Sequence, residues 1–251
     1  MKAIYQPKGK AGEYAAWACN LYVGCSNGCS YCYCKKGVLG SVCGDKPRLK
    51  KSLTDIDTAL WVFTNECNAH IEELRRDGLF FTFTSDPMLR ETIALNWGCI
   101  QYAAYRGIRC DILTKRADFF GYWPIDLRGL EDRIRWGFTL TGADELERNA
   151  SPNAERIKTM HKLHDMGFRT FASVEPVVDP KKAVSILVQT KEFCDHYKVG
   201  LMSGAPEGFY KKEEIQKMYE IFRDSGKDVY FKKSLTDYLG VAPDKRATSL
   251  P

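Results

Sequence analysis

The sequence predicts an α/β fold in which parallel strands are covered by outer helices. Short apolar runs of strand length alternate with helical patterns, as in parallel strands joined by crossover helices. Roughly six or seven such units suit a partial (β/α)6-type or near-complete TIM-like barrel better than a doubly wound sheet. The predicted strands are 17–23, 79–84, 109–114, 135–141, 169–174, 199–202 and 229–231.

Two segments between these strands place apolar residues on one helical face. The first face comprises Ile56, Leu60, Phe63, Cys67 and Leu74, and the second comprises Ile215, Met218, Tyr219 and Phe222. A further helix is predicted over 153–166. There Ser151 is a suitable N-cap, Pro152 suits the first helical position, and Gly167 provides the stop.

Composition is that of an ordinary globular chain of 251 residues, with 44% hydrophobic and 27% charged residues. We expect one domain over 1–251, with a short N-terminal segment 1–14 and a C-terminal tail 240–251. Neither a long apolar run nor a signal-peptide pattern is found, which predicts a cytoplasmic protein without a membrane partner. Its ten cysteines are therefore expected to be reduced thiols.

Polar residues follow each predicted strand. In a parallel barrel, function gathers at the carboxyl ends of the strands, so these residues would share one rim. They include Ser85, Asp86, Lys115, Thr141, Asp144, Glu175, Ser203, Gly204, Glu207 and Lys232.

The loop 24–37 carries three cysteines, Cys25, Cys29 and Cys32, in a C-x3-C-x2-C pattern. Three thiolates on one tight loop can hold three irons of a 4Fe–4S cluster, and a missing fourth ligand leaves one iron open to a small molecule. The alternatives are a structural zinc site, which would normally need a second cysteine pair, and scattered core thiols. Tyr31 and Tyr33 flank the last cysteine, where they could contact a cofactor.

The segment 20–33, Asn-Leu-Tyr-Val-Gly-Cys-Ser-Asn-Gly-Cys-Ser-Tyr-Cys-Tyr, resembles the opening motif of radical S-adenosylmethionine (SAM) enzymes. More narrowly, it is similar to the spore photoproduct lyase-like branch and to a phage-associated branch. The segments 84–87, 112–116, 139–148, 174–180 and 229–233 resemble those branches in the same order.

This resemblance implies a radical SAM barrel with a 4Fe–4S cluster on Cys25, Cys29 and Cys32. SAM would chelate the open iron, and a reductant such as flavodoxin or ferredoxin would supply the electron that cleaves SAM. Cleavage yields methionine and a 5′-deoxyadenosyl radical, which abstracts a hydrogen atom from the substrate.

The resemblance also implies a SAM site at the strand ends. Its expected contacts are Ser85 and Asp86 to the methionyl ammonium, Lys115 to the carboxylate, Thr139 or Thr141 to the ribose, and the backbone of Ser203 and Gly204 to the adenine. The structural alternatives are a helix start at Asp86, a solvated loop lysine at Lys115 and a rim salt bridge at Glu175.

One position departs from the spore photoproduct lyase pattern. That pattern implies a cysteine ahead of the Thr-Ser-Asp segment, which returns a hydrogen atom to the product radical, whereas this chain has Phe83. Cys34, Cys99 or Cys110 could substitute for it, and Tyr33 could relay hydrogen.

A nucleoside-sized substrate is expected, because no basic arm or aromatic strip for gripping a duplex follows the last predicted strand. Compact relatives of this branch include lyases that release queuine from queuosine, and this is the leading hypothesis. The radical would take a ribose hydrogen, and the glycosidic bond would then break.

A guanine-type edge calls for a carboxylate, and hydroxyls or phosphate call for amide and basic groups. The candidates are Glu13, Asp144, Glu175 and Glu207 as carboxylates, with Asn20, Arg148, Lys232 and Lys233 as the other groups. Two alternatives remain: a radical SAM enzyme that repairs or modifies DNA or RNA, and a non-enzymatic iron–sulfur or zinc sensor.

Overall fold

An eight-stranded sheet forms the centre of the computed structural model, which describes residues 2–40, 42–246, 248 and 250. Its strand order is β1-β2-β5-β6-β7-β8-β9-β10, and β3 pairs with β4 in a separate ribbon. The strands are β1 (Ile4–Tyr5), β2 (Ala18–Cys19), β3 (Tyr22–Val23), β4 (Arg48–Leu49), β5 (Leu79–Phe81), β6 (Cys110–Thr114), β7 (Ile134–Thr139), β8 (Arg169–Val177), β9 (His196–Leu201) and β10 (Asp228–Phe231).

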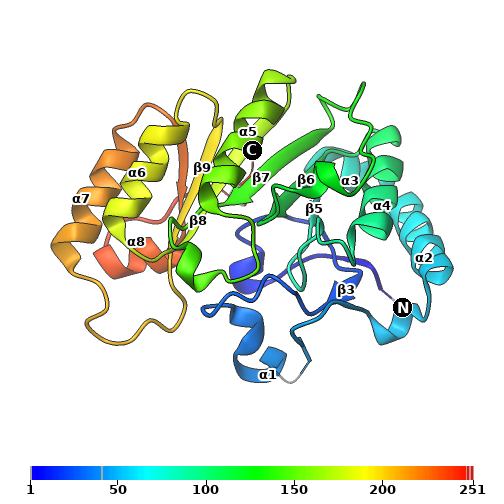
Figure 1. Cartoon of the computed structure of the whole chain (residues 1–251), viewed down its shortest axis with the longest axis horizontal. Helices are drawn as coiled ribbons and strands as arrows, with labels where there is room; N and C mark the ends of the chain where they lie inside the picture. Colours follow the sequence, from blue (N-terminus) through cyan, green and yellow to red (C-terminus); the bar gives the residue numbers. More distant parts are fainter. Residues whose placement is uncertain (1, 41, 247, 249, 251) are drawn as a thin grey trace.

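Within the eight-stranded sheet, the described strands from β2 through β5 to β10 are parallel to their neighbours, and β1 pairs with β2 in the antiparallel direction. The separate β3–β4 ribbon is antiparallel. The order begins at β1 and ends at β10, so the described strands form an open sheet. Helices surround the sheet on its outer side (Figure 1). The predicted α/β fold with parallel strands and outer helices is confirmed, in its partial-barrel form.

Most of the parallel strands are joined through α-helices, as crossover connections require, whereas the described chain between β6 and β7 has only a 3-10 turn at Phe119–Gly121. Eight α-helices lie within the described residues. They are α1 (Gly37–Gly40), α2 (Ile56–Ala69), α3 (Ile71–Asp77), α4 (Ile93–Tyr105), α5 (Asn153–Asp165), α6 (Pro180–Thr190), α7 (Lys212–Arg223) and α8 (Lys233–Leu239). Within the described residues, no helix has the length and apolarity needed to cross a membrane.

Two of the predicted helices agree with the structure and one is interrupted. Helix α5 begins at Asn153 with Pro152 at the N-cap, one position later than the predicted cap, and Ser151 Oγ accepts from the Ala117 N–H at 2.9 Å instead of capping the helix. Gly167, whose φ is +91°, ends the helix as predicted. The apolar face of α7 is buried. The face predicted from 56 to 74 is divided at His70 between α2 and α3, and its first residue, Ile56, is 57% exposed.

The strand predicted over 17–23 is also divided. Ala18–Cys19 joins the main sheet as β2, whereas Tyr22–Val23 turns away and pairs with Arg48–Leu49. Strand β9 begins at His196, three positions before the predicted start at 199, and therefore includes Lys198. The sequence pattern missed this start because polar residues point inward there.

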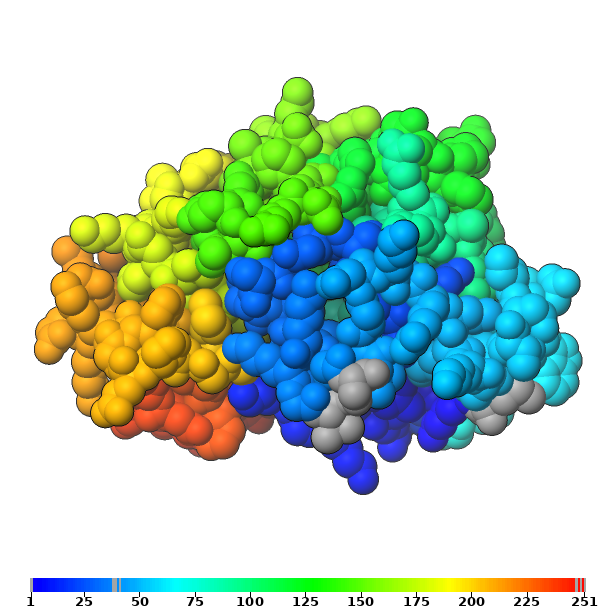
Figure 2. All heavy atoms as spheres, turned by 60° about the horizontal axis from the view of Figure 1, so that its bottom comes forward, coloured from blue at the N-terminus to red at the C-terminus, as the bar shows by residue number. Residues whose placement is uncertain are grey.

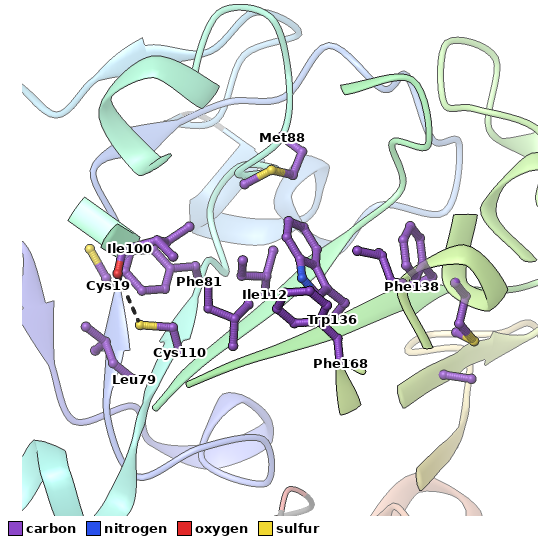
Figure 3. Close-up of a cluster of buried hydrophobic side chains, with 14 of the residues drawn as sticks. Cys19, Leu79, Phe81, Met88, Ile100, Cys110, Ile112, Trp136, Phe138 and Phe168 are labelled. Carbon is purple, nitrogen blue, oxygen red and sulfur yellow. Dashed lines mark hydrogen bonds between the residues drawn. The ribbon is translucent and has the colours of Figure 1, made fainter. Parts of the chain in front are cut away.

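Two apolar clusters lie on opposite faces of the sheet. The larger fills the space between sheet and helices and contains Phe81, Ile112 and Trp136 (Figure 3). The smaller lies on the inner face and includes Phe80 of β5 and Phe171 of β8. Since β6 and β7 separate those two strands, their shared cluster requires a strongly curved sheet.

Gly137 of β7 makes room for Phe171 inside the curve. A Cβ atom at Gly137 would overlap the Phe171 ring, which lies on the neighbouring strand directly opposite it. Glycine is usually unfavourable within a strand, and here the close approach of this ring requires it.

We expect Gly137→Ala to lower the free energy of unfolding by about 1–3 kcal/mol, because the added methyl overpacks a filled interior. Gly98→Ala is the matched control. Gly98 lies inside α4 with nothing within 4 Å of an added Cβ, so that change should stabilise by about 0.5–1 kcal/mol. Urea unfolding of both variants measures the difference. Equal effects of the two substitutions would contradict the packing assigned to Phe171.

Candidate functional site

The cysteine loop lies against the carboxyl ends of β5 and β7. The Gly24 N–H donates to the Thr84 carbonyl at 3.0 Å, and the Ser30 N–H donates to the Leu146 carbonyl at 2.9 Å. Cys29 forms an isolated antiparallel bridge with Glu147. The loop is therefore fixed to the rim where function was expected.

The cysteine loop begins with a tight turn at Gly24. Gly24 has a φ of +89°, and an added Cβ would lie 2.8 Å from the Gly44 carbonyl oxygen. Any larger residue would have to displace backbone, so this position requires glycine.

Cys25, Cys29 and Cys32 all carry free thiols, Cys29 buried and the other two partly exposed. Three thiols on one short loop are the soft donors that iron–sulfur clusters use. Within the described part of the chain, no group of three His, Cys, Asp or Glu side chains is arranged as a ready metal site. The ligand assignment therefore rests on residue type and spacing.

Asp86 connects the loop to two strand ends. Its Oδ2 accepts from Asn27 Nδ2 and from the Lys115 N–H, each at 2.8 Å. Its Oδ1 accepts from Thr114 Oγ1 at 2.7 Å and from the Met88 N–H at 3.0 Å. A carboxylate offers roughly four acceptor positions, and all are used here. Asp86 thus serves as an internal anchor, whereas the sequence predicted contact with the SAM ammonium.

Two buried acceptors beside Asp86 remain open. Ser85 Oγ and Asn27 Oδ1 are inaccessible to solvent and have no hydrogen-bond partner among the described residues. A buried polar atom without a partner is costly, and such atoms mark places where a ligand or water completes the structure. These two atoms could accept hydrogen bonds from an ammonium group.

Glu147 is a second buried carboxylate that the sequence analysis did not select. Tyr31 Oη donates to its Oε1, and Arg156 Nη2 pairs with its Oε2. Lys115 Nζ lies 3.9 Å from Oε1 and 5.6 Å from the centre of the Tyr31 ring. Burial and the negative charge of Glu147 raise the pKa of Tyr31, so its hydroxyl remains a donor.

Arg156 links Glu147 to the end of β7 through hydrogen bonds. It is fully buried and donates from Nε to the Ser151 carbonyl at 2.6 Å and from Nη1 to the Thr139 carbonyl at 2.5 Å. The Thr139 carbonyl is therefore occupied. Thr141 Oγ1 accepts from the Ala143 N–H at 3.2 Å. Both threonines are buried at the rim.

A third cluster lies on the inner faces of β8 to β10. Glu175 accepts from Tyr14 Oη at 2.6 Å and from Lys232 Nζ at 2.8 Å. Lys198 Nζ is 3.8 Å from Glu175, and Glu13 is 3.4 Å from Lys232. Burial alone would raise the pKa of Glu175, but the two lysines outweigh it and hold the pKa below its usual value.

Several predicted residues lie elsewhere on the rim or in structural roles. Asn20 donates to Tyr5 Oη and accepts from the Phe83 N–H, both at 2.8 Å. Asp144 accepts from the backbone N–H of Asn153 at 2.8 Å at the start of α5. Tyr33 is half-exposed and donates to the Phe83 carbonyl.

The remaining predicted residues are more peripheral. Ser203 accepts from Lys10 Nζ at 2.9 Å, next to the exposed Gly204. Arg148 and Glu207 are exposed. Arg148 was the predicted substrate residue here, whereas its neighbour Glu147 points inward.

Removing one partner of the Glu147–Arg156 pair should be strongly destabilising. We expect Arg156→Met to lower the free energy of unfolding by about 3–5 kcal/mol, since it leaves a buried carboxylate under-compensated. The double change with Glu147→Leu should recover much of the loss. Arg128→Met removes an exposed pair with Asp126 and should cost less than about 1 kcal/mol. Denaturant unfolding tests this, and similar costs for both arginines would contradict the assigned role.

A scan against protein-family models and a search of curated proteins each find no match. Solved structures do match. Spore photoproduct lyase complexed with dinucleoside spore photoproduct has a TM-score of 0.63 and 16% identity, covering 87% of this chain and 77% of that chain.

Two further matches have bound ligands in their structures. A doubly substituted spore photoproduct lyase with bound AdoMet and dinucleoside spore photoproduct gives a TM-score of 0.57 at 18% identity, covering 82% of this chain and 61% of that one. SuiB of Streptococcus suis bound to S-adenosylmethionine gives 0.56 at 10% identity, covering 88% and 51%. The chain therefore has the fold that the resemblance implies, shared with spore photoproduct lyase and SuiB.

Proposed function

We propose that this chain is a radical SAM enzyme, a lyase acting on a nucleoside-type substrate. The observation that carries the proposal is the three-cysteine loop, fastened by Asp86 and Glu147 to the carboxyl ends of β5, β6 and β7. The fold shared with spore photoproduct lyase and SuiB supports it.

Cys25, Cys29 and Cys32 would hold a 4Fe–4S cluster. When bound and reduced, such a cluster with SAM supplies a 5′-deoxyadenosyl radical for hydrogen abstraction. The chain's own contribution is to hold SAM in one orientation beside the loop.

The methionyl end of SAM carries an ammonium and a carboxylate. We assign the ammonium to Ser85 Oγ and Asn27 Oδ1, because both are buried acceptors without a partner in the described residues. We assign the carboxylate to Lys115, whose pairing with Glu147 is long at 3.9 Å and leaves donors available. Thr141 is the candidate for the ribose, and the backbone at Ser203 and Gly204 for the adenine.

The substrate would occupy the curve of the sheet below this rim. Phe83 has no weakly bonded hydrogen to return, so we propose that the radical left after bond cleavage takes one electron from the same low-potential reductant that cleaves SAM and one proton from solvent, in place of a hydrogen atom from a cysteine. In its most specific form, the proposal is release of queuine from queuosine. Spore photoproduct lyase binds a dinucleoside, which supports a nucleoside-type ligand for this fold.

The cluster assignment predicts a selective loss. We expect Cys25→Ala, Cys29→Ala and Cys32→Ala each to abolish 5′-deoxyadenosine formation by anaerobically reconstituted, dithionite-reduced protein with SAM. Cys43→Ala is the matched control, a buried thiol outside the three-cysteine pattern. Product formation is followed by chromatography and iron content by elemental analysis. Loss in the Cys43 variant would indicate a fourth side-chain ligand and contradict an open iron.

The substrate assignment predicts free queuine when the reduced protein is given SAM and queuosine. Mass spectrometry detects the base, and the amount formed should rise with the 5′-deoxyadenosine produced. Abundant 5′-deoxyadenosine without any queuine would exclude this substrate while leaving the radical chemistry intact.

A further inference from the structure

Lys198 is the most unusual buried group in the molecule. It lies in the middle of β9 with 0% of its surface exposed. Its Nζ has no hydrogen-bond partner within residues 2–40, 42–246, 248 and 250. Its side chain points to the inner face, where its strand neighbours are Ser173 and Tyr230.

Keeping an amine in this position is costly. A buried polar group without a hydrogen bond loses free energy on folding, and a buried charge loses more. Burial lowers the pKa of Lys198 well below its usual value, and the negative charge of Glu175 at 3.8 Å only partly offsets this. The Tyr14 ring and Glu175 lie near this amine but accept no hydrogen bond from it, and a ligand carbonyl would supply the missing acceptor.

The groups around Lys198 are arranged about one planar ring. Lys198 Nζ lies against the face of the Tyr14 ring, and Lys232 Nζ is 5.1 Å from the ring centre. The Tyr14 hydroxyl donates to Glu175 at 2.6 Å and lies 2.9 Å from Ser173 Oγ. The site thus holds a flat ring by cations at its face and by a carboxylate acceptor at its edge.

Glycine at position 200 keeps this arrangement close. An added Cβ would lie 2.9 Å from Lys232 Cδ and 3.2 Å from Glu175 Oε1. The absence of a side chain at Gly200 therefore lets Lys232 and the Glu175 carboxylate meet.

We propose that Lys198 and Glu175 recognise the lactam edge of the substrate's base and that Tyr14 holds this place until the base enters. The base would lie turned relative to the Tyr14 ring, so that its edge meets the Lys198 amine that now lies against the ring face. A lactam presents a carbonyl acceptor beside an N–H donor. An amine donor and a carboxylate acceptor 3.8 Å apart are the complementary pair. This inference rests on the proposed nucleoside substrate and names the feature of the base that the site selects.

The Tyr14 ring packs against Phe80 and Phe83 in the smaller apolar cluster, and its segment is tied down by polar contacts at its edges. Glu13 accepts from the Lys233 N–H at 2.8 Å, and Lys10 donates to Ser203 Oγ at 2.9 Å. Polar contacts of this kind exchange with water at modest cost. The N-terminal third of the chain spreads across the centre of the face that carries α1, with a small hollow among its atoms (Figure 2).

The test first removes the Tyr14 ring and then asks whether the emptied site prefers a base with a lactam edge. Tyr14→Ala removes the ring, and titration calorimetry then compares inosine, which has a lactam edge, with purine riboside, which lacks it. We expect about tenfold or greater preference for inosine, because a site built to pair a polar edge rejects an analogue without it. Adding Lys198→Met should abolish that preference. Adding Lys162→Met instead should leave the preference for inosine unchanged, because Lys162 lies on α5 over the Phe120 ring, outside this cluster.

Fold integrity is measured on the same proteins. Lys198→Met removes one of the two lysines beside Glu175 and leaves Lys232 as its partner, so thermal unfolding of each variant shows whether it still folds. Equal binding of the two nucleosides to Tyr14→Ala, or a preference that survives Lys198→Met, would overturn the inference. SAM cleavage measured without nucleoside distinguishes the two proposals. If cleavage persists while the lactam preference is absent, the radical SAM assignment stands and the base-recognition role fails.

Discussion

The site depends on one buried carboxylate whose acceptors are all satisfied. Asp86 joins Asn27 of the cysteine loop, the end of β6 and its own turn through four hydrogen bonds. A hydrogen bond to a charged group contributes more to the free energy of folding than a bond between neutral groups. Each of these bonds also fixes the orientation of its donor relative to Asp86. Because the loop itself contains few regular hydrogen bonds, this carboxylate together with Glu147 gives it a defined position. The orientation of Lys115 and of the open acceptors on Ser85 and Asn27 follows from that anchoring.

The fold was predictable wherever apolar periodicity was strong. Strands β6 and β7 lie within one residue of their predicted starts, because both faces of a central parallel strand are covered and most of each run is apolar. The charged residues in these strands, Asp111 and Arg135, pair with each other. Prediction was poorer where strands point polar residues inward. In β9, His196, Lys198 and Gly200 alternate with apolar Tyr197, Val199 and Leu201, and reading that alternation from 196 would have found the strand.

The predicted site residues show a similar division. Motif spacing located the cysteine loop, Ser85 and Lys115, all of which meet at one rim. Spacing could not show that Asp86 is fully occupied, that Glu147 rather than Arg148 points inward, or that Arg156 reaches from α5 to the Thr139 carbonyl. Those facts depend on side-chain direction and on which acceptors remain open. Both are tertiary properties that a linear pattern does not carry.

The inner surface of the sheet is divided between two kinds of chemistry. On the side of β5 to β7, backbone groups and anchored carboxylates surround the cysteine loop and leave acceptors open to a cation. On the side of β8 to β10, lysines surround a carboxylate and leave a donor open. A ligand with an ammonium would bind to the first side, and one with a carbonyl to the second.

Tyr14 extends from the β1–β2 edge and reaches Ser173 and Glu175, so one N-terminal segment spans the gap between these two sides. Under the proposed function, that geometry would bring a bound cofactor and a base-bearing substrate face to face inside one curved sheet, as a reaction between them requires.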